Sequence, residues 1–558
     1  MLALLAAIPI IIVGVLMIGF MWPAMKAMPL GWIAAVIIGV IWWDMPLNWI
    51  MGASIGGVID AFGILLIVFG ALLILQLLKE SGGVDSISYS MATVSTDRRV
   101  QALLLAFLMG AFFEGAAGFG TPAAVAAPLL VALGHPPLIA ATIALIGNSV
   151  PVSFGAVGVP IWGGFDVVDG LVELPLESMG AQIETFRAFL ESVGGYAAIL
   201  NGSMAIFIPL AIVGVMTKIA EGSLLKGLKV WPLAIFSGLI FGLPMIFIAN
   251  FIGPELPSLL GSLIALPIFV FAVRRGFLVP GDEWDYPDKE NWEDEWEDEV
   301  EAEAEIPDPD ELTVTVTPFK AWLPYLIIAA VLVITRIEAF GLVGTLQGVE
   351  IGWENILGTD VSEAVAPLYN PGIIPFILVA LFIPYLLGME KGKASKCWME
   401  TLSTVKPAAI ALFFAVAMVY VMMNSDPVVE YTMLEEMAFA TANIFGGAWH
   451  FGAPFVGTLG AFISGSNTVS NIMFGAFQFE TAMAAGVEVI PTLGLQTAGA
   501  AGGNMLCVHN VVAAITTVGL VGKAGLVMRK TILVTILYGL FIALLTTFLV
   551  GTLYAGIF

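Results

Sequence analysis

Two glycine-rich segments decide how this chain folds. Residues 110–122 read GAFFEGAAGFGTP, and residues 460–471 read GAFISGSNTVSN. Each segment lies in the middle of a long apolar stretch, at about residues 100–134 and 453–485. Both stretches have the same order of features: an apolar arm, a tip of glycine and small polar residues, and a second apolar arm. We therefore predict two helical hairpins related as an inverted-topology repeat.

The composition of the chain is typical of a membrane protein. Of its 558 residues, 59% are apolar and 11% are charged, whereas soluble proteins have about 25% charged residues. Apolar runs of about 20 residues, the length that crosses a bilayer core, recur along the whole sequence. We predict crossings at residues 2–22, 30–45, 57–78, 138–162, 196–217, 230–250, 257–273, 320–340, 371–388, 407–424, 489–520 and 530–555. The predicted fold is an all-α polytopic membrane protein with about 12 transmembrane helices plus two re-entrant hairpins and broken helices, located in the cell membrane.

Charge and cysteine content exclude several other classes of protein. The 44 acidic residues outnumber the 20 basic ones, which leaves a formal net charge of -24, so a basic surface for nucleic acid is absent. The two cysteines, Cys397 and Cys507, lie far apart in the sequence. They predict neither a disulfide framework nor a cysteine-rich metal site. We expect no metal and no cofactor.

Basic residues indicate the topology, because Lys and Arg in short loops stay on the cytoplasmic side. They fall in alternate loops if both termini are outside and each hairpin returns to the side it entered. The first hairpin then opens to the cytoplasm and the second to the exterior. We predict a first membrane half over residues 1–275, an acidic cytoplasmic linker over 276–318 and a second half over 319–558. Because Asp282–Glu311 has seventeen acids and one base, we predict a disordered, solvated spacer there.

Interrupted helices predict where a ligand binds. Irregular backbone survives in a bilayer only where it is buried in protein or lines a cavity, and a helix that restarts after a break points free N–H groups and its positive dipole end at the gap. We predict an anion site where the two tips meet the two glycine-broken spans that follow them. For the glycines alone, close helix packing is the competing explanation. The candidate substrate ligands are Gly118, Gly120, Thr121, Asn148, Ser149, Ser153, Ser466, Asn467, Thr468 and Asn504.

Ionisable residues inside these elements are candidates for carrying a proton. Glu114 lies four residues before Gly118 in an apolar run, where an isolated carboxyl is more stable with its proton on. His509, on the second broken span, can exchange a proton near physiological pH. Each has a structural alternative: Glu114 as a group that bonds the hairpin backbone, and His509 as a satisfied core histidine. Asp60 is a third acid in an apolar span and is left without a role.

The longest distinctive run also resembles a known family. Residues 112–160, FFEGAAGFGTPAAVAAPLLVALGHPPLIAATIALIGNSVPVSFGAVGVP, closely resemble the L-lactate permease family, as do the length and the glycine-rich segment near Gly503. The resemblance implies a secondary transporter that takes up lactate or glycolate with protons. The Ser466-Asn467-Thr468 triplet also looks like the hairpin-tip motif of the wider ion-transporter superfamily, which includes sodium-coupled dicarboxylate and citrate transporters. Because the first tip lacks that triplet and has Glu114 nearby, we favour proton coupling over sodium coupling.

Two other functions compete with proton-coupled lactate uptake. Sodium-coupled uptake of a di- or tricarboxylate is the main alternative. An intramembrane enzyme, such as a lipid-linked group transferase, needs clustered acids for a metal or a nucleophile with its base, and the sequence offers neither, so we predict that the chain is not an enzyme. The predicted partners are a small carboxylate, H⁺ and the lipid bilayer, with a homodimer left open.

Overall fold

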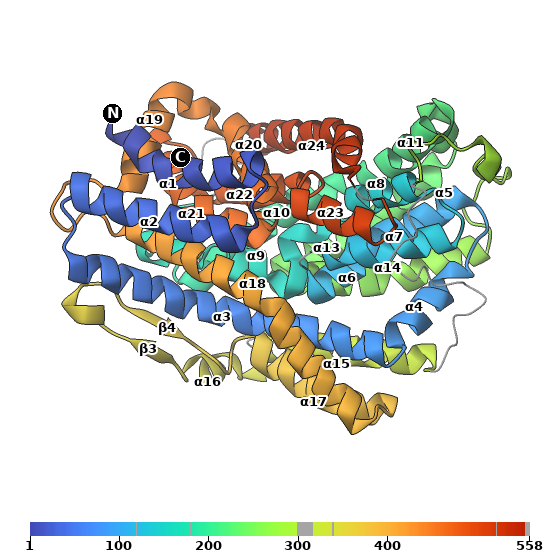
Figure 1. Ribbon diagram of the computed structural model, residues 1–558, viewed down its shortest axis with the longest axis horizontal. Helices are drawn as coiled ribbons and strands as arrows, with labels where there is room; N and C mark the ends of the chain where they lie inside the picture. The colour runs from blue at the N-terminus through green and yellow to red at the C-terminus, as the bar shows by residue number, and fades with distance from the viewer. Residues whose placement is uncertain (119, 179–180, 298–315, 338–339, 521, 553–558) are drawn as a thin grey trace.

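The computed structural model describes residues 1–118, 120–178, 181–297, 316–337, 340–520 and 522–552. In these residues the protein is built almost entirely of helices (Figure 1). The helices before the acidic linker are α1 (Leu2–Gly14), α2 (Ala24–Trp42), α3 (Leu47–Glu80), α4 (Gly83–Ala92), α5 (Arg98–Gln101), α6 (Gly110–Ala117), α7 (Thr121–Ala132), α8 (Pro137–Gly147), α9 (Gly155–Trp162), α10 (Phe186–Met204), α11 (Ile208–Glu221), α12 (Leu224–Leu228), α13 (Trp231–Phe251) and α14 (Pro257–Arg274).

The second set follows the linker, and two short hairpins of strand accompany the helices. These helices are α15 (Pro318–Arg336), α16 (Val343–Gln347), α17 (Leu378–Leu387), α18 (Lys391–Met423), α19 (Met433–Phe445), α20 (Trp449–Ser464), α21 (Asn467–Ala485), α22 (Val489–Gly503), α23 (Val508–Thr516) and α24 (Ala524–Thr552). The strands β1 (Leu176–Ser178) and β2 (Ala181–Ile183) pair antiparallel, with Leu176 opposite Ile183. The strands β3 (Ile351–Trp353) and β4 (Glu363–Val365) do the same, with Ile351 opposite Val365.

The helices form two groups. Long helices α3 and α18 pack along each other, and α2, α17 and β4 pack against one or the other of them, as the lower part of Figure 1 shows. The second group, which we call the hairpin group, consists of α6–α10 and α20–α23. Every residue of α6 and of α22 is buried. Because all faces of these two helices are covered by protein, their polar residues can interact only with other protein groups or with a ligand.

Both predicted helical hairpins are present. The first has an arm from Arg98 to Ala117 that includes a π-helix over 102–109, a tip at residues 118–120, and α7, which folds back against α6 and the π-helix. Phe119 lies outside the described residues. The second hairpin consists of α20, a tip at Gly465-Ser466, and α21 packed against α20. The re-entrant insertion of these hairpins and the division into two membrane halves stay predictions.

Both spans that follow the hairpins are interrupted, as predicted. The first breaks after Gly147, continues as a 3-10 turn over 150–154 and restarts in α9, with a bend of 45°. The second breaks at residues 504–507 between α22 and α23. Within α9, Ala156 (φ 42°) and Val157 (φ 59°) have left-handed backbone, which L-residues other than Gly rarely adopt. This unusual backbone faces the first hairpin tip, because Ala156 lies against Gly118.

The predicted number of crossings is confirmed, but one member of the set differs. Within the described residues, eleven helices are long and apolar enough to cross a membrane, and the bent pair at residues 137–162 makes twelve. The first hairpin arm, Arg98–Ala117, is one of the eleven. The predicted span at 371–388 forms only a shorter apolar helix, Gly372–Leu387. The protein is therefore a multi-pass membrane protein.

The first part of the acidic linker is ordered against the helices, so the prediction of disorder is wrong for residues 282–297, although most of their acidic side chains are exposed. Trp296 is 2% exposed and packs in an apolar cluster with Leu138 of α8 and Val511 of α23. The Lys523 ammonium donates to the carbonyl oxygens of linker residues 294, 295 and 297, and Arg98 forms an ion pair of 2.8 Å with Asp285. Tryptophans interspersed among the acids give this stretch apolar surface to bury. Residues 298–315 of the linker lie outside the described residues.

Candidate functional site

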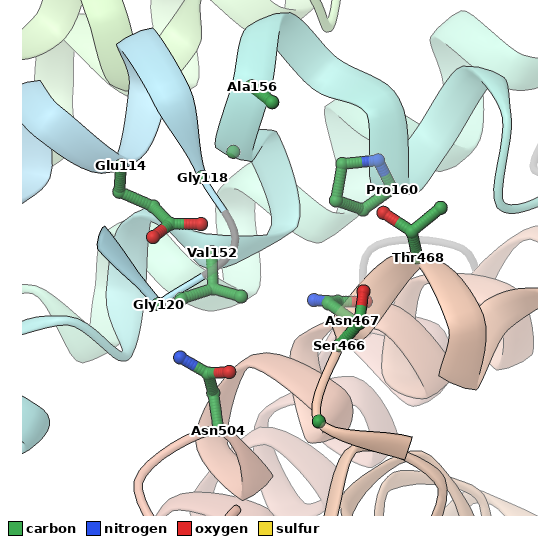
Figure 2. A pocket seen from close by; sticks show the side chains of 12 residues that line it. Glu114, Gly118, Gly120, Val152, Ala156, Pro160, Ser466, Asn467, Thr468 and Asn504 are labelled. Carbon is green, nitrogen blue, oxygen red and sulfur yellow. The ribbon is translucent and has the colours of Figure 1, made fainter. Parts of the chain in front are cut away.

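A small cavity lies where the hairpin tips meet the interrupted spans (Figure 2). Its volume is about 20 Å³. The lining residues from the first half of the chain are Glu114, Gly118, Gly120, Val152, Gly155, Ala156 and Pro160, and those from the second half are Gly465, Ser466, Asn467, Thr468 and Asn504. Figure 2 shows the two sets on opposite sides of the cavity. Segments that are far apart in sequence thus converge on one cavity.

The second arms of both hairpins begin at this cavity. Gly120 is the N-terminal cap of α7 and has a left-handed φ of 75°. No side chain forms a capping hydrogen bond at this end of the helix. Ser466 caps α21, because its hydroxyl accepts from the backbone N–H of Val469. The first N–H groups of a helix have no partner within the helix, and its N-terminus has a partial positive charge. Two helix N-termini at one cavity make it electrostatically suited to an anion.

Among the described residues that line the cavity, only Glu114 has a side chain that can ionise. It is 3% exposed, and its Oε2 atom has no hydrogen-bond partner among the described residues. Neighbouring Asn148 is 1% exposed, and both polar atoms of its amide also lack a partner. Gly155 provides the space for the carboxyl, because a Cβ atom at residue 155 would overlap Glu114 Oε1. The Glu114 carboxyl can bind a proton, and both side chains can form hydrogen bonds with a water or a substrate.

One backbone carbonyl joins the two halves beside the cavity. The Thr497 oxygen accepts from the Ser153 hydroxyl at 3.0 Å and from the Asn467 amide at 2.9 Å. The Thr497 hydroxyl in turn donates to Asn467 Oδ1 at 3.1 Å. Asn201 extends the network by donating to Ser153 Oγ at 2.8 Å and accepting from Tyr538 at 2.8 Å. The second tip is therefore held on α22 by the full amide of Asn467.

Comparison with known proteins identifies the family. Residues 2–553 match the family model of L-lactate permease. The chain belongs to the L-lactate permease family. A relative from Haemophilus influenzae is 31% identical over 95% of each chain. The L-lactate permease of Bacillus subtilis is 28% identical, with 89% of this chain and 87% of that protein covered, and the glycolate permease of Escherichia coli K12 is 28% identical, with 98% and 95% covered.

Among solved structures, the similarity is more distant. The YdaH transporter of Alcanivorax borkumensis covers 90% of this chain and 87% of its own, with a TM-score of 0.42 and 11% identity. The family membership therefore comes from the sequence comparisons, and the description of the site comes from this protein's own geometry.

Several predicted ligands of this permease family member lie beside the cavity and bond to the backbone instead of lining it. The Thr121 hydroxyl donates to the Gly118 oxygen at 2.6 Å, and the Ser149 hydroxyl donates to the Ile146 oxygen at 2.7 Å. Ser153 bonds Thr497, as described above. His509 has an exposed side chain on α23, next to Gly465 and outside the cavity lining. These residues shape the tips and the breaks, whereas Glu114 and the Ser466-Asn467-Thr468 tip face the cavity itself.

The sequence interpretation missed Asn510 and the apolar lining. Asn510 is 1% exposed, donates to Asn504 Oδ1 at 2.6 Å and has its own Oδ1 without a partner among the described residues. That Oδ1 atom faces Gly120 of the first tip, where a Cβ would overlap it. An asparagine in the second broken span was a visible signal for this role. Val152 and Ala156 gave no such signal, because their apolar side chains are typical of any membrane helix.

Proposed function

We propose that this protein is a secondary transporter that takes up L-lactate and related small 2-hydroxymonocarboxylates, such as glycolate, together with protons. Relatives named as L-lactate permeases and as a glycolate permease support the substrate class. The observation that carries the proposal is the position of Glu114, an ionisable group in a cavity that also receives two helix N-termini. The chain has no catalytic role in this proposal.

The substrate carboxylate binds between the N-termini of α7 and α21. The partial positive charge of each helix and the first N–H groups of α21 offset the cost of removing the anion from water. At α7 the Thr121 N–H already donates to the Gly118 oxygen, and Pro122 has no N–H. Thr468 and Asn504 line the same space and can orient the 2-hydroxyl group through hydrogen bonds. None of the lining residues in the described part of the chain is Lys or Arg, so these residues give the anion no fixed countercharge. A weakly held anion suits a transporter, which must release what it binds.

Proton coupling follows from like charges in one small space. A substrate carboxylate and an ionised Glu114 repel each other strongly in a buried site. Anion binding and protonation of Glu114 therefore favour one another, and by linkage each raises the affinity for the other. A loaded site with one proton and one monoanion is electrically neutral, which lowers the cost of moving it across the membrane.

The size of the cavity implies that the site must open. A volume of about 20 Å³ holds roughly a single water molecule, so a 2-hydroxy acid cannot occupy it in this conformation. The two tips must move apart, or one hairpin must move against α3 and α18, before substrate enters. Opening alternately to the two sides is the usual mode of transporters built from inverted repeats.

Uptake into proteoliposomes tests the proposal. An inward lactate gradient should make the outside solution more alkaline, and an imposed inward proton gradient should drive accumulation of labelled lactate. Sodium and pH gradients should be varied independently, because the Ser466-Asn467-Thr468 tip resembles that of sodium-coupled carboxylate transporters. Uptake that ignores the proton gradient but requires sodium would contradict the proposal and favour the sodium-coupled alternative.

A further inference from the structure

A second and larger cavity lies on the side of the molecule predicted to be external. Its volume is about 230 Å³, and its lining includes Asp60 of α3, Trp162 at the end of α9, Asp166, Glu255 and Arg336. The start of α9, at Ala156, lines the central cavity. Pro160, two residues before Trp162, also lines the central cavity, so the two cavities adjoin the same short helix.

Carboxyl groups from three elements lie in or beside this outer cavity. Asp60 is 3% exposed, and its carboxyl lies beside that of Asp166, which lines the same cavity, and near the hydroxyl of Tyr420 on α18. The Tyr420 hydroxyl donates its single proton to Glu363 Oε2 of β4 at 2.5 Å. Ionised carboxyls only accept hydrogen bonds, so two of them cannot bond each other without a proton.

Unsatisfied atoms in the cavity indicate that a donor is missing. No N–H or O–H group within the described residues bonds Oδ2 of Asp60. Glu255 is 1% exposed, and its Oε2 atom also has no hydrogen-bond partner among the described residues. Both residues line the cavity. A buried acceptor without a donor is costly, and a proton on the carboxyl pair supplies the donor that the protein does not.

Two arginines lie near the cavity, and each forms an ion pair, although Nη1 of Arg187 has no hydrogen-bond partner among the described residues. Arg336 is 2% exposed, forms an ion pair with Glu255 and donates to the Tyr369 carbonyl at 2.6 Å. Arg187 bonds Glu191 at 2.7 Å and lies over the ring of Trp162. Asp169 is one more acid facing Asp166. Acids thus outnumber bases around the cavity, which favours a positive ligand over an anion, and no group of three ligands suited to a metal occurs in the described part of the chain.

We propose that Asp60 and Asp166 form a second proton-binding site, in which one proton taken from the outer solution is shared between the two carboxyl groups. The site lies at the far end of α9 from Glu114, on the predicted external side. Burial and the neighbouring Glu363 and Asp169 raise the pKa of Asp166 to about 7, so Asp166 can take up or release a proton in the physiological range. Its use in transport rests on the proposed function, but the sharing of the proton does not.

Infrared spectroscopy of the purified protein tests the shared proton without relying on transport. The spectra should be taken in a Glu114→Gln background, so that the central carboxyl does not contribute to the carbonyl band of protonated acids. The band should weaken as the pH rises through about 7. Asp60→Asn and Asp166→Asn should each remove the same component, and the double variant should remove no more, because one proton serves the pair. An amide at either residue can still donate to the remaining carboxylate, which preserves folding.

The controls separate this site from other acids and from the transport proposal. Asp360→Asn, an exposed aspartate near β4, should leave the band unchanged. Loss of a different component in each single variant, or no loss in either, would overturn the shared site.

The transport role of the site is tested in proteoliposomes with Glu114 intact. Asp60→Asn should shift the external pH at which proton-driven uptake is half-maximal while leaving lactate exchange at equal pH unchanged. An unshifted profile would overturn the site's role in transport. Failure of the unaltered protein to accumulate lactate would contradict the proposed function and leave the infrared result standing.

Discussion

The two hairpin tips have similar backbone geometry and different chemistry. Gly120 and Gly465, with φ of 75° and 81°, stand just before the second arm of each hairpin. The first tip lacks a capping side chain and has the Glu114 carboxyl one turn upstream, whereas the second has the Ser466 cap and the Asn467 amide. A repeated backbone thus positions two kinds of group on one cavity. We infer that the first tip governs coupling to protons and that the second holds and orients the substrate.

Removing the carboxyl from the first tip should have the largest effect. A one-unit pH gradient can sustain about tenfold accumulation of a monoanion that moves with one proton, and Glu114→Gln should reduce accumulation to equilibrium. Exchange of labelled lactate across vesicles should persist, because the amide keeps the size of the side chain. Equal loss of accumulation and exchange would show that Glu114 only shapes the hairpin, and would remove the proposed division between the tips.

Adding a methyl group to the first tip should come next. Gly120→Ala imposes a left-handed backbone on alanine, which costs about 1–2 kcal/mol, and brings its Cβ into Asn510 Oδ1. Thermal unfolding in detergent should occur at a lower temperature, and uptake should fall with it. Gly222→Ala is the matched control, since its φ is 71° but no atom lies within 4 Å of the added carbon. If both variants lose the same stability, the contact between Gly120 and Asn510 has no energetic role.

Truncating the amide of the second tip should have a moderate effect. Asn467→Ala removes two hydrogen bonds to Thr497, each contributing about 0.5–1.5 kcal/mol, so we expect the apparent affinity for lactate to weaken about tenfold. Proton-driven accumulation at saturating lactate should survive, in contrast to Glu114→Gln. The exposed Asn250, which donates to the Ile246 carbonyl at 2.9 Å, is a control: Asn250→Ala should leave affinity unchanged. An unaltered affinity in Asn467→Ala would remove the second tip from the substrate site.

Making the second tip resemble the first should have the smallest effect. Ser466→Gly removes the capping hydroxyl, and glycine at a helix N-cap costs only a few tenths of a kcal/mol relative to serine. The apparent affinity for lactate should change less than twofold. Ser466→Ala should cost about 1 kcal/mol and weaken affinity about fivefold. If glycine proves as damaging as alanine, the hydroxyl contacts the substrate directly and does more than cap α21.

The sequence predicted the hairpins and breaks well because their signals are local. Gly118, Gly120 and Gly465 stand out in apolar runs, since a tight turn inside a membrane has few other solutions. Contacts between distant segments had no such signal: nothing in the sequence places Asn510 against Gly120, or Ser153 and Asn467 on the same carbonyl. The tryptophans of the linker were visible, but the acids around them dominated the interpretation. The predicted crossing at residues 371–388 was too long, because apolar character alone does not set the length of a helix; the helix there spans only Gly372–Leu387.

The Thr497 carbonyl has a consequence for how the two repeats move. It accepts one hydrogen bond from Ser153 of the first broken span and another from Asn467 of the second tip, so both repeats bind the same atom of α22. A motion that carries Ser153 away from Asn467 must therefore break at least one of these two hydrogen bonds.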